Sequence, residues 1–532
     1  MALREVIARN TAYNALGRVW EAVAGLVLVA YIVARVGIEQ YGLWAIVAAF
    51  TGYASLFDLG IGSAYSRFVA EHNARGERER VSAVISTGLL YQIFFAIAFV
   101  AVAWLGVDAL VWALRTWDGA GALGSPEVIA ELRVLLRWSF VLFGLTGCLA
   151  PFASVPIGMQ RMDVSNVLGA ATSLVKIGAT VFFLESGHGL RGLVYANAVV
   201  TGAFAVAAVV AAFVLCPWLR VAPWRASRTV FRRLFGFGWR TQVSRLANLI
   251  TFETDVLIIT FVLRDLQLAG LYKIGLELAN KMRQAPVVMM SALIPAAAQL
   301  DAQQDGERLT RMYVRGTKYV AAVAIPLAAF VAGGAGLLMT AWQGGTAELG
   351  VAVGVLRVIA AGYLTNILPG PGVAVSLGMG RAEIQMYSGL ISMVSNITLT
   401  IGLVFAFGFW GVPAGTVLSM ALSWAWFARS MRGAIGVGAA MLWREALRGP
   451  AIAILVPLAV VAACDALSNG IDSRAAALGI LVAVLPIFTG LYLGLLRLQA
   501  NFDAADLDFL GNVLKLRRVP GFAAWARPLR QH

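Results

Sequence analysis

The sequence predicts an all-α polytopic membrane protein with about fourteen transmembrane helices. Two features point to this fold class. Of the 532 residues, 60% are hydrophobic and only 13% are charged, whereas a soluble domain of ordinary composition carries about 25% charged residues. Apolar runs of about 20 residues also recur along the whole chain, and each is long enough for a helix to cross the hydrocarbon core of a bilayer. Lipid is therefore expected to surround most of the chain.

The expected helices lie between clusters of charged residues and turn formers, because these residues mark where the chain leaves the hydrocarbon. They cover residues 14–36, 40–66, 82–107, 133–158, 164–185, 191–216, 235–263, 267–298, 314–341, 350–376, 384–407, 409–432, 449–464 and 475–497. The first run follows Arg4 and Arg9, as a secretory signal would, but a second apolar run comes directly after it without a cleavage site between them. The first helix is therefore expected to remain uncleaved.

The basic residues orient these helices, because loops on the cytoplasmic side of a membrane protein carry an excess of Lys and Arg. Positive charge concentrates in alternate loops, notably those around 75–80, 225–233 and 308–315, and in the C-terminal tail. We therefore expect these loops and both termini to lie in the cytoplasm. The same loops account for the net charge of +14, so no nucleic-acid partner is expected.

Two halves of the chain match each other at a nearly constant offset, which predicts an internal repeat. The run that begins at Gly42 corresponds to the run at Gly270, an offset of 228 residues, and Gly158 corresponds to Gly378 at an offset of 220. Six helices in each repeat would give two lobes that run in the same direction and are related by a pseudo-two-fold axis along the membrane normal. Chance matching in a sequence rich in Gly and Ala is the alternative explanation.

The repeat divides the chain into five expected parts. These are an N-terminal lobe at 1–220, a cytoplasmic linker at 221–234, a C-terminal lobe at 235–435, two additional helices within 449–497, and a cytoplasmic tail at 498–532. The outer loops are short, so no soluble catalytic domain is expected. Three cysteines and three histidines are scattered along the chain, and their spacing matches no metal motif.

Four short runs carry a resemblance to a known family. They are Arg9-Asn10 with Asn14, Val36–Trp44, Leu56–Gly62 followed by Arg67, and Asp255 followed by Ala269–Tyr272 and Ala292–Pro295. With these runs the chain resembles the polysaccharide or O-antigen flippases of the multidrug, oligosaccharidyl-lipid and polysaccharide exporter superfamily.

The resemblance implies both a fold and a function. It implies fourteen helices, with two six-helix lobes around a central cavity, in the inner membrane of a bacterium. It also implies transport, by alternating access, of a lipid-pyrophosphate-linked oligosaccharide from the cytoplasmic to the periplasmic leaflet. The protein is then not an enzyme and needs no cofactor, although a proton or sodium gradient is a candidate for coupling. Membrane lipids and other polysaccharide-assembly proteins are its expected partners.

Polar residues form stripes on several expected helices, although an ionisable group at the bilayer centre costs about 2.5–3.5 kcal/mol or more. In the helix expected at 235–263, Arg240, Ser244, Asn248, Thr251 and Asp255 follow one another at intervals of three or four residues. Such spacing places them on one helical face. Similar stripes on helices of both lobes predict a hydrated interior.

The deeper cations and two amides are the candidates for substrate binding. They are Arg18, Lys176, Arg245, Lys281, Arg283, Asn14 and Asn248. A pyrophosphate requires cations, and arginine suits it because the guanidinium offers paired donors. The alternative is that each cation serves only to neutralise a nearby carboxylate, as Lys281 would with Glu277.

Five acids are candidates for coupling to an ion or for pairing with these cations. They are Glu21, Asp58, Glu253, Asp255 and Glu277. Each could hold a proton or a sodium ion, and pairing with a neighbouring cation is the alternative.

Two other functions stay open at this point. A cation-coupled multidrug exporter of the same architecture would favour an apolar, aromatic cavity with few fixed cations. A membrane-embedded glycosyltransferase or polymerase would need catalytic groups on a substantial outer loop, and the outer loops here are short. The peptidoglycan lipid-precursor flippases are resembled less closely.

Overall fold

The computed structural model describes residues 3–55, 61–118, 125–284, 290, 293–345, 347–468, 470–499 and 506. Within these residues the chain forms helices and contains no strand. Ten segments of this described part of the chain are long and apolar enough to cross a membrane, and three of them contain more than one helix, namely Gly350–Gly378, Ala382–Ile435 and Ala439–Leu467. The all-α membrane fold is thus confirmed, whereas the count of fourteen helices stays a prediction.

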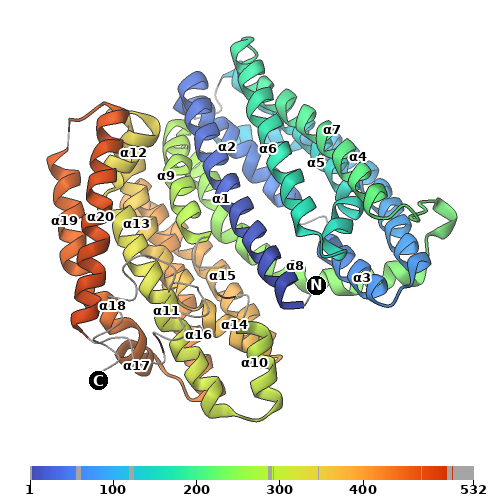
Figure 1. The fold of residues 1–532 in the computed structure, drawn as a ribbon. Helices are drawn as coiled ribbons and strands as arrows, with labels where there is room; N and C mark the ends of the chain where they lie inside the picture. The colour runs from blue at the N-terminus through green and yellow to red at the C-terminus, as the bar shows by residue number, and fades with distance from the viewer. Residues whose placement is uncertain are drawn as a thin grey trace. The chain divides into compact units, whose positions relative to one another are not determined.

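The helices group into two compact units, which we call unit 1 and unit 2 (Figure 1). Unit 1 comprises Met1–Ile274 and Ser392–Thr416. Its helices are α1 (Leu3–Val36), α2 (Ile38–Ala54), α3 (Ile61–Ala74), α4 (Arg78–Asp118), α5 (Pro126–Gly158), α6 (Met162–Glu185), α7 (Gly189–Leu215), η2 (Pro223–Arg225), α8 (Arg228–Val262) and η5 (Gly408–Trp410), with parts of α9 (Leu266–Gln284), α15 (Ala382–Phe407) and α16 (Gly411–Ile435).

Unit 2 comprises Gly275–Ile391 and Val417–His532. It contains the remaining parts of α9, α15 and α16, together with α10 (Leu293–Ala302), α11 (Gly306–Gly333), α12 (Ala335–Gln343), η4 (Ala347–Leu349), α13 (Gly350–Ile367), α14 (Gly370–Gly378), α17 (Ala439–Leu442), the π-helical turn η6 (Trp443–Leu447), α18 (Arg448–Ala453), α19 (Leu455–Leu467) and α20 (Arg474–Leu498). The units are defined by internal contacts and the expected lobes by the repeat, so the lobe boundaries stay a prediction.

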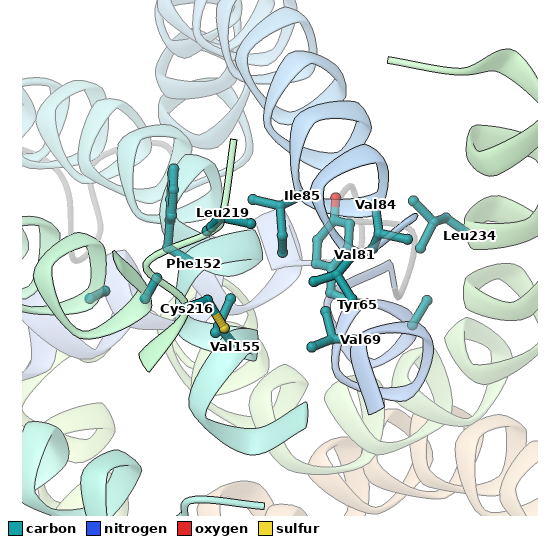
Figure 2. Close-up of a cluster of buried hydrophobic side chains, with 13 residues drawn as sticks. Tyr65, Val69, Val81, Val84, Ile85, Phe152, Val155, Cys216, Leu219 and Leu234 are labelled. Atoms are coloured by element: carbon teal, nitrogen blue, oxygen red, sulfur yellow. The ribbon is translucent and has the colours of Figure 1, made fainter. Parts of the chain in front are cut away.

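The core of unit 1 is a cluster of mostly aliphatic and aromatic side chains from α3, α4, α5, α7, α8 and the segment that links α7 to α8 (Figure 2). Tyr65, Ile85 and Val155 are completely buried there. Next to this cluster, hydroxyl groups on α4 hold the segment that links α7 to α8. Ser82, Ser86 and Thr87 accept hydrogen bonds from the backbone amides of Arg220, Ala222 and Ser227, at 3.2, 3.2 and 3.0 Å. These bonds satisfy backbone groups of a segment that lacks helical partners.

Two glycines let α2 and α9 approach backbone to backbone within unit 1. A Cβ added to Gly42 would lie 2.0 Å from the carbonyl oxygen of Leu266, and one added to Gly270 would lie 2.3 Å from the carbonyl oxygen of Ile38. The offset of 228 residues that relates Gly42 to Gly270 also relates Ile38 to Leu266. The two contacts are therefore reciprocal, as they are across a two-fold axis.

Candidate functional site

The polar stripe on α8 places Asp255 in the interior of unit 1. Its side chain is among the most deeply buried of the charged residues, at 1% exposure. One turn earlier, the hydroxyl of Thr251 donates to the carbonyl of Ala247 and lies 3.4 Å from the hydroxyl of Ser392 on α15. The side chains of Ser244 and Asn248 lie outside the described residues.

Three further elements bring polar groups to Asp255. The hydroxyl of Thr416 on α16 donates to Oδ2 of Asp255 at 2.6 Å, and the hydroxyl of Tyr272 on α9 donates to the same oxygen. The amide nitrogen of Asn396 on α15 donates in turn to the hydroxyl of Thr416 at 3.0 Å. Four helices thus surround one carboxylate with neutral polar groups.

No cation compensates this carboxylate among the described residues. Every ion pair found there, with a nitrogen-to-oxygen distance of 4.0 Å or less, involves another acid. The buried oxygens Oδ1 of Asp255, Oδ1 of Asn396 and Oγ1 of Thr400 also have no hydrogen-bond partner in the described part of the chain. A buried carboxylate without a counter-ion is costly, so this arrangement favours the capture of a proton or a small cation by Asp255.

Glu253, two residues before Asp255, has a cation beside its carboxylate. Its Oε2 lies 3.3 Å from Nζ of Lys273, whose side chain is largely buried. The hydroxyl of Tyr53 lies 2.5 Å from that of Thr254, between the two acids. Because Glu253 has a cation beside it, its charge is balanced in place, whereas that of Asp255 is not.

The expected substrate cations are divided between the two units. Lys281 and Arg283 are half-buried on the part of α9 that belongs to unit 2. The guanidinium of Arg283 lies over the ring of Tyr363, 5.4 Å from its centroid, and the hydroxyl of Tyr363 donates to Asn280 at 2.7 Å. Lys176 is exposed on α6 in unit 1. A single lining formed by all these cations therefore stays a prediction.

Several expected site residues lie outside what the structure describes. The backbones of Asn14, Arg18, Arg245 and Asn248 are helical, but their side chains are not among the described ones. Asp58 lies outside the described residues altogether. Glu21 is exposed on α1, next to Gly169 of α6, and Glu277 is half-buried on α9.

Part of the Asp255 site could not be predicted from the sequence. Asn396 was visible as one member of a polar stripe on the helix expected at 384–407, with Gln385, Ser388 and Ser392. Thr416 was not singled out by the sequence, and Tyr272 appeared only as part of the run Ala269–Tyr272 that carries the family resemblance. Among the described residues, no group of three or more His, Cys, Asp or Glu side chains could hold a metal ion.

Comparisons with known proteins agree with this architecture. The model of a family described as polysaccharide biosynthesis protein matches residues 7–301. A protein named "Probable flippase AglR" from Haloferax volcanii is 22% identical over 426 residues, which are 78% of this chain and 81% of that protein.

Two solved structures share the fold. One is the lipid II flippase MurJ in an inward closed conformation, with a TM-score of 0.63, 12% identity and coverage of 91% of this chain and 98% of that chain. The other is a multidrug resistance transporter of the MATE family in an inward-facing conformation, with a TM-score of 0.57, 14% identity and coverage of 80% and 94%. The fold is therefore shared by flippases and multidrug exporters.

Proposed function

We propose that this chain, which belongs to the polysaccharide biosynthesis protein family, is a flippase for a lipid-pyrophosphate-linked oligosaccharide. It carries this substrate from the cytoplasmic to the periplasmic leaflet of a bacterial inner membrane during the assembly of O-antigen, capsule or exopolysaccharide. The family match over more than half of the chain carries the proposal, and the flippase named among its relatives supports it. Transport without chemical conversion needs no catalytic group and no organic cofactor.

An ion gradient supplies the energy for this transport. We assign coupling to Asp255, through the binding of a proton or a sodium ion. The support is its burial, the neutral donors around it and the absence of a cation beside it among the described residues. Binding of a cation offsets a charge that is otherwise costly in the protein interior, so the occupied and empty forms of the site stabilise different arrangements of the four helices.

The handling of the substrate is assigned to the cations. Lys281 and Arg283 on α9, with Arg18, Lys176 and Arg245, engage the phosphates or acidic sugars. Alternating access brings the substrate from one side to the other, with both termini and the loop at 225–233 in the cytoplasm.

Deletion of the gene tests the function directly. A lipid-linked oligosaccharide is expected to accumulate on the cytoplasmic side, and mass spectrometry of extracted lipids would identify it. Wild-type protein should clear the accumulated lipid, whereas a variant with Arg18, Lys281 and Arg283 changed to alanine should reach the membrane and fail to clear it. A deletion strain that accumulates no glycan lipid but becomes sensitive to cationic drugs would instead identify a multidrug exporter.

A further inference from the structure

A polar pocket lies within unit 2, at the end where α12 leads into α13 and α19 leads into α20. Its volume is about 590 Å³, which is within the range of about 300–1,000 Å³ common for small-molecule sites. Arg357, Asp465 and Asp472 are its charged lining residues. None of them is part of the proposed transport site. The pocket is at the end of the unit that the distribution of Lys and Arg predicts to be outside.

The deepest charged group of this pocket is Asp465, which is fixed in place. Its side chain is 2% exposed. Oδ1 accepts a hydrogen bond from the backbone amide of Leu337 in the first turn of α12, and Oδ2 accepts one from Nη2 of Arg357, each at 2.6 Å. A Cβ at Gly336 would lie 2.9 Å from Oδ1, so the glycine permits this approach. Both carboxylate oxygens are thus engaged by groups of the protein.

Among the described residues, Arg357 is held through Nη2 of its guanidinium by Asp465. Its side chain is 51% exposed, and a guanidinium has five donors. Asp465 therefore orients Arg357 and leaves other donors directed into the pocket. Arginine within a membrane segment is uncommon and generally marks a functional position, and a guanidinium oriented in this way can bind a phosphate through paired hydrogen bonds.

The second charge of the pocket is farther out. Asp472 lies in the loop between α19 and α20, where its backbone carbonyl accepts a hydrogen bond from the amide of Gly345 at 3.3 Å. Arg357 follows Gly350, the first residue of α13, by seven positions, which corresponds to about 10 Å along the helix. The pocket therefore presents a cation at depth and a carboxylate at its rim.

This order of charges matches one kind of lipid headgroup. The segment Gly350–Gly378 has 29 residues, or about 43 Å at 1.5 Å per residue, which covers the hydrocarbon and both headgroup layers. Arg357 is then just below the headgroup layer, where a long side chain extends outward to the lipid phosphates. In a phospholipid with an ethanolamine headgroup, the phosphate is attached nearer the hydrocarbon and the ammonium is farther out.

We propose that the pocket binds the headgroup of a zwitterionic phospholipid from the predicted outer leaflet. The guanidinium of Arg357 binds the phosphate, and the carboxylate of Asp472 accepts hydrogen bonds from the primary ammonium. Asp465 acts as a positioning residue, because it touches Arg357 and the backbone of α12. Phosphatidylethanolamine satisfies both charges, whereas phosphatidylglycerol offers the phosphate without the ammonium. The proposal does not depend on what the protein transports.

Native mass spectrometry of the purified full-length protein, titrated with single phospholipids, tests this site. Wild-type protein should bind phosphatidylethanolamine about tenfold more tightly than phosphatidylglycerol, as expected for one charge-assisted hydrogen-bond set. Arg357→Ala should weaken phosphatidylethanolamine binding by about tenfold or more. Asp472→Asn should remove the preference between the two lipids while phosphate binding persists.

Two further variants control for folding and for surface charge. Gly350 lies on the same face of α13 as Arg357, and a Cβ there meets nothing within 4 Å. Gly350→Trp should therefore fill the pocket and reduce binding while it leaves the Arg357–Asp465 pair intact. Arg191→Ala is the matched control, because Arg191 also pairs with a carboxylate, that of Glu131 at 3.0 Å, and is 49% exposed, but belongs to unit 1. It should bind as the wild type does.

Two results would overturn the proposal. One is wild-type affinity for phosphatidylethanolamine in both Arg357→Ala and Gly350→Trp. The other is equal binding of phosphatidylethanolamine and phosphatidylglycerol by the wild-type protein. Loss of binding in Gly350→Trp with an unchanged melting temperature supports it even where Arg357→Ala folds poorly.

Discussion

Asp255 in unit 1 and Asp465 in unit 2 are two aspartates buried to nearly the same extent, at 1% and 3% exposure. They differ in what surrounds them. Both oxygens of Asp465 are engaged, one by a guanidinium and one by a backbone amide. Within the described part of the chain only Oδ2 of Asp255 is engaged, by two neutral hydroxyl groups. Two carboxylates buried to a similar extent therefore have different electrostatic surroundings.

This difference determines whether each carboxylate gains free energy by binding a cation from solution. The guanidinium of Arg357 balances the charge of Asp465, so binding of a cation from solution there releases little free energy. The charge of Asp255 has no such balance among the described residues, so a proton or sodium ion lowers its free energy on binding.

The largest expected effect is on transport. Asp255→Asn keeps the shape of the side chain and removes its charge, so export should fall by about 100-fold or more if coupling requires the carboxylate. The variant should fold normally and melt at the same temperature or higher, because a buried charge without a counter-ion has been removed. Glycan export in a deletion strain and melting of the purified protein measure the two effects. Normal export by this variant would contradict the assignment.

The corresponding change in unit 2, Asp465→Asn, should lower the stability and leave export per folded molecule unchanged. Asp465→Asn leaves the guanidinium of Arg357 without its carboxylate, and we expect a loss of about 1–2 kcal/mol of stability, reduced because Arg357 is half-exposed. Export should decrease only in proportion to the amount of folded protein. Thermal melting in detergent, with export normalised to the protein in the membrane, separates these quantities. A loss of export at full folded yield would remove the contrast between the two aspartates.

A smaller effect is expected at the hydroxyl nearest to Asp255. Thr416→Val removes the donor to Oδ2 at 2.6 Å while it retains the side-chain volume. The loss of one hydrogen bond to a charged group is worth about 1.5–3 kcal/mol, so the cation dependence of export should shift by roughly tenfold or more while the maximal rate is retained. Export measured against sodium concentration and against pH would show which cation is involved. No shift with either cation would place the coupling group elsewhere.

The smallest effect concerns a carboxylate that is only partly buried, with a side chain 28% exposed. Glu77, in the loop before α4, lies 2.6 Å from Nδ1 of His72. The hydrogen bond from His72, assisted by the nearby charges of Arg80 and Arg75, lowers the pKa of Glu77 below its usual 4.5. Its stabilising contribution is therefore present above about pH 4.5 and is lost as the pH falls through the lowered pKa. Glu77→Gln should flatten the acid side of the pH–stability curve slightly, as measured by melting over a pH series, and an unchanged curve would contradict the pairing.

The fold class could be predicted from the sequence because it depends on local hydropathy alone. The position of Asp255 on a polar stripe was also predictable, since residues three or four apart share a helical face. Its partner Thr416 is 161 residues away in sequence, and Arg357 is 108 residues from Asp465. Pairings of this kind depend on how distant helices pack, and the spacing of polar residues along one helix gives no indication of a partner on another helix.

The surroundings of Arg283 were harder to predict for a related reason. Arg283 was recognised by its charge, but its neighbour is Tyr363 of α13, which turns one face of its ring towards the guanidinium. Helical spacing defines the face that a residue occupies on its own helix. It does not define what lies opposite that face.

The crossing of α2 and α9 has a mechanical consequence. At Gly42 and Gly270 the two backbones touch without an intervening side chain, so there is no rotamer whose adjustment could absorb a displacement of one helix relative to the other. The contact therefore has little compliance. A tilt of α9 at this contact therefore moves α2 as well, because no side chain between the two backbones can adjust to take up the displacement.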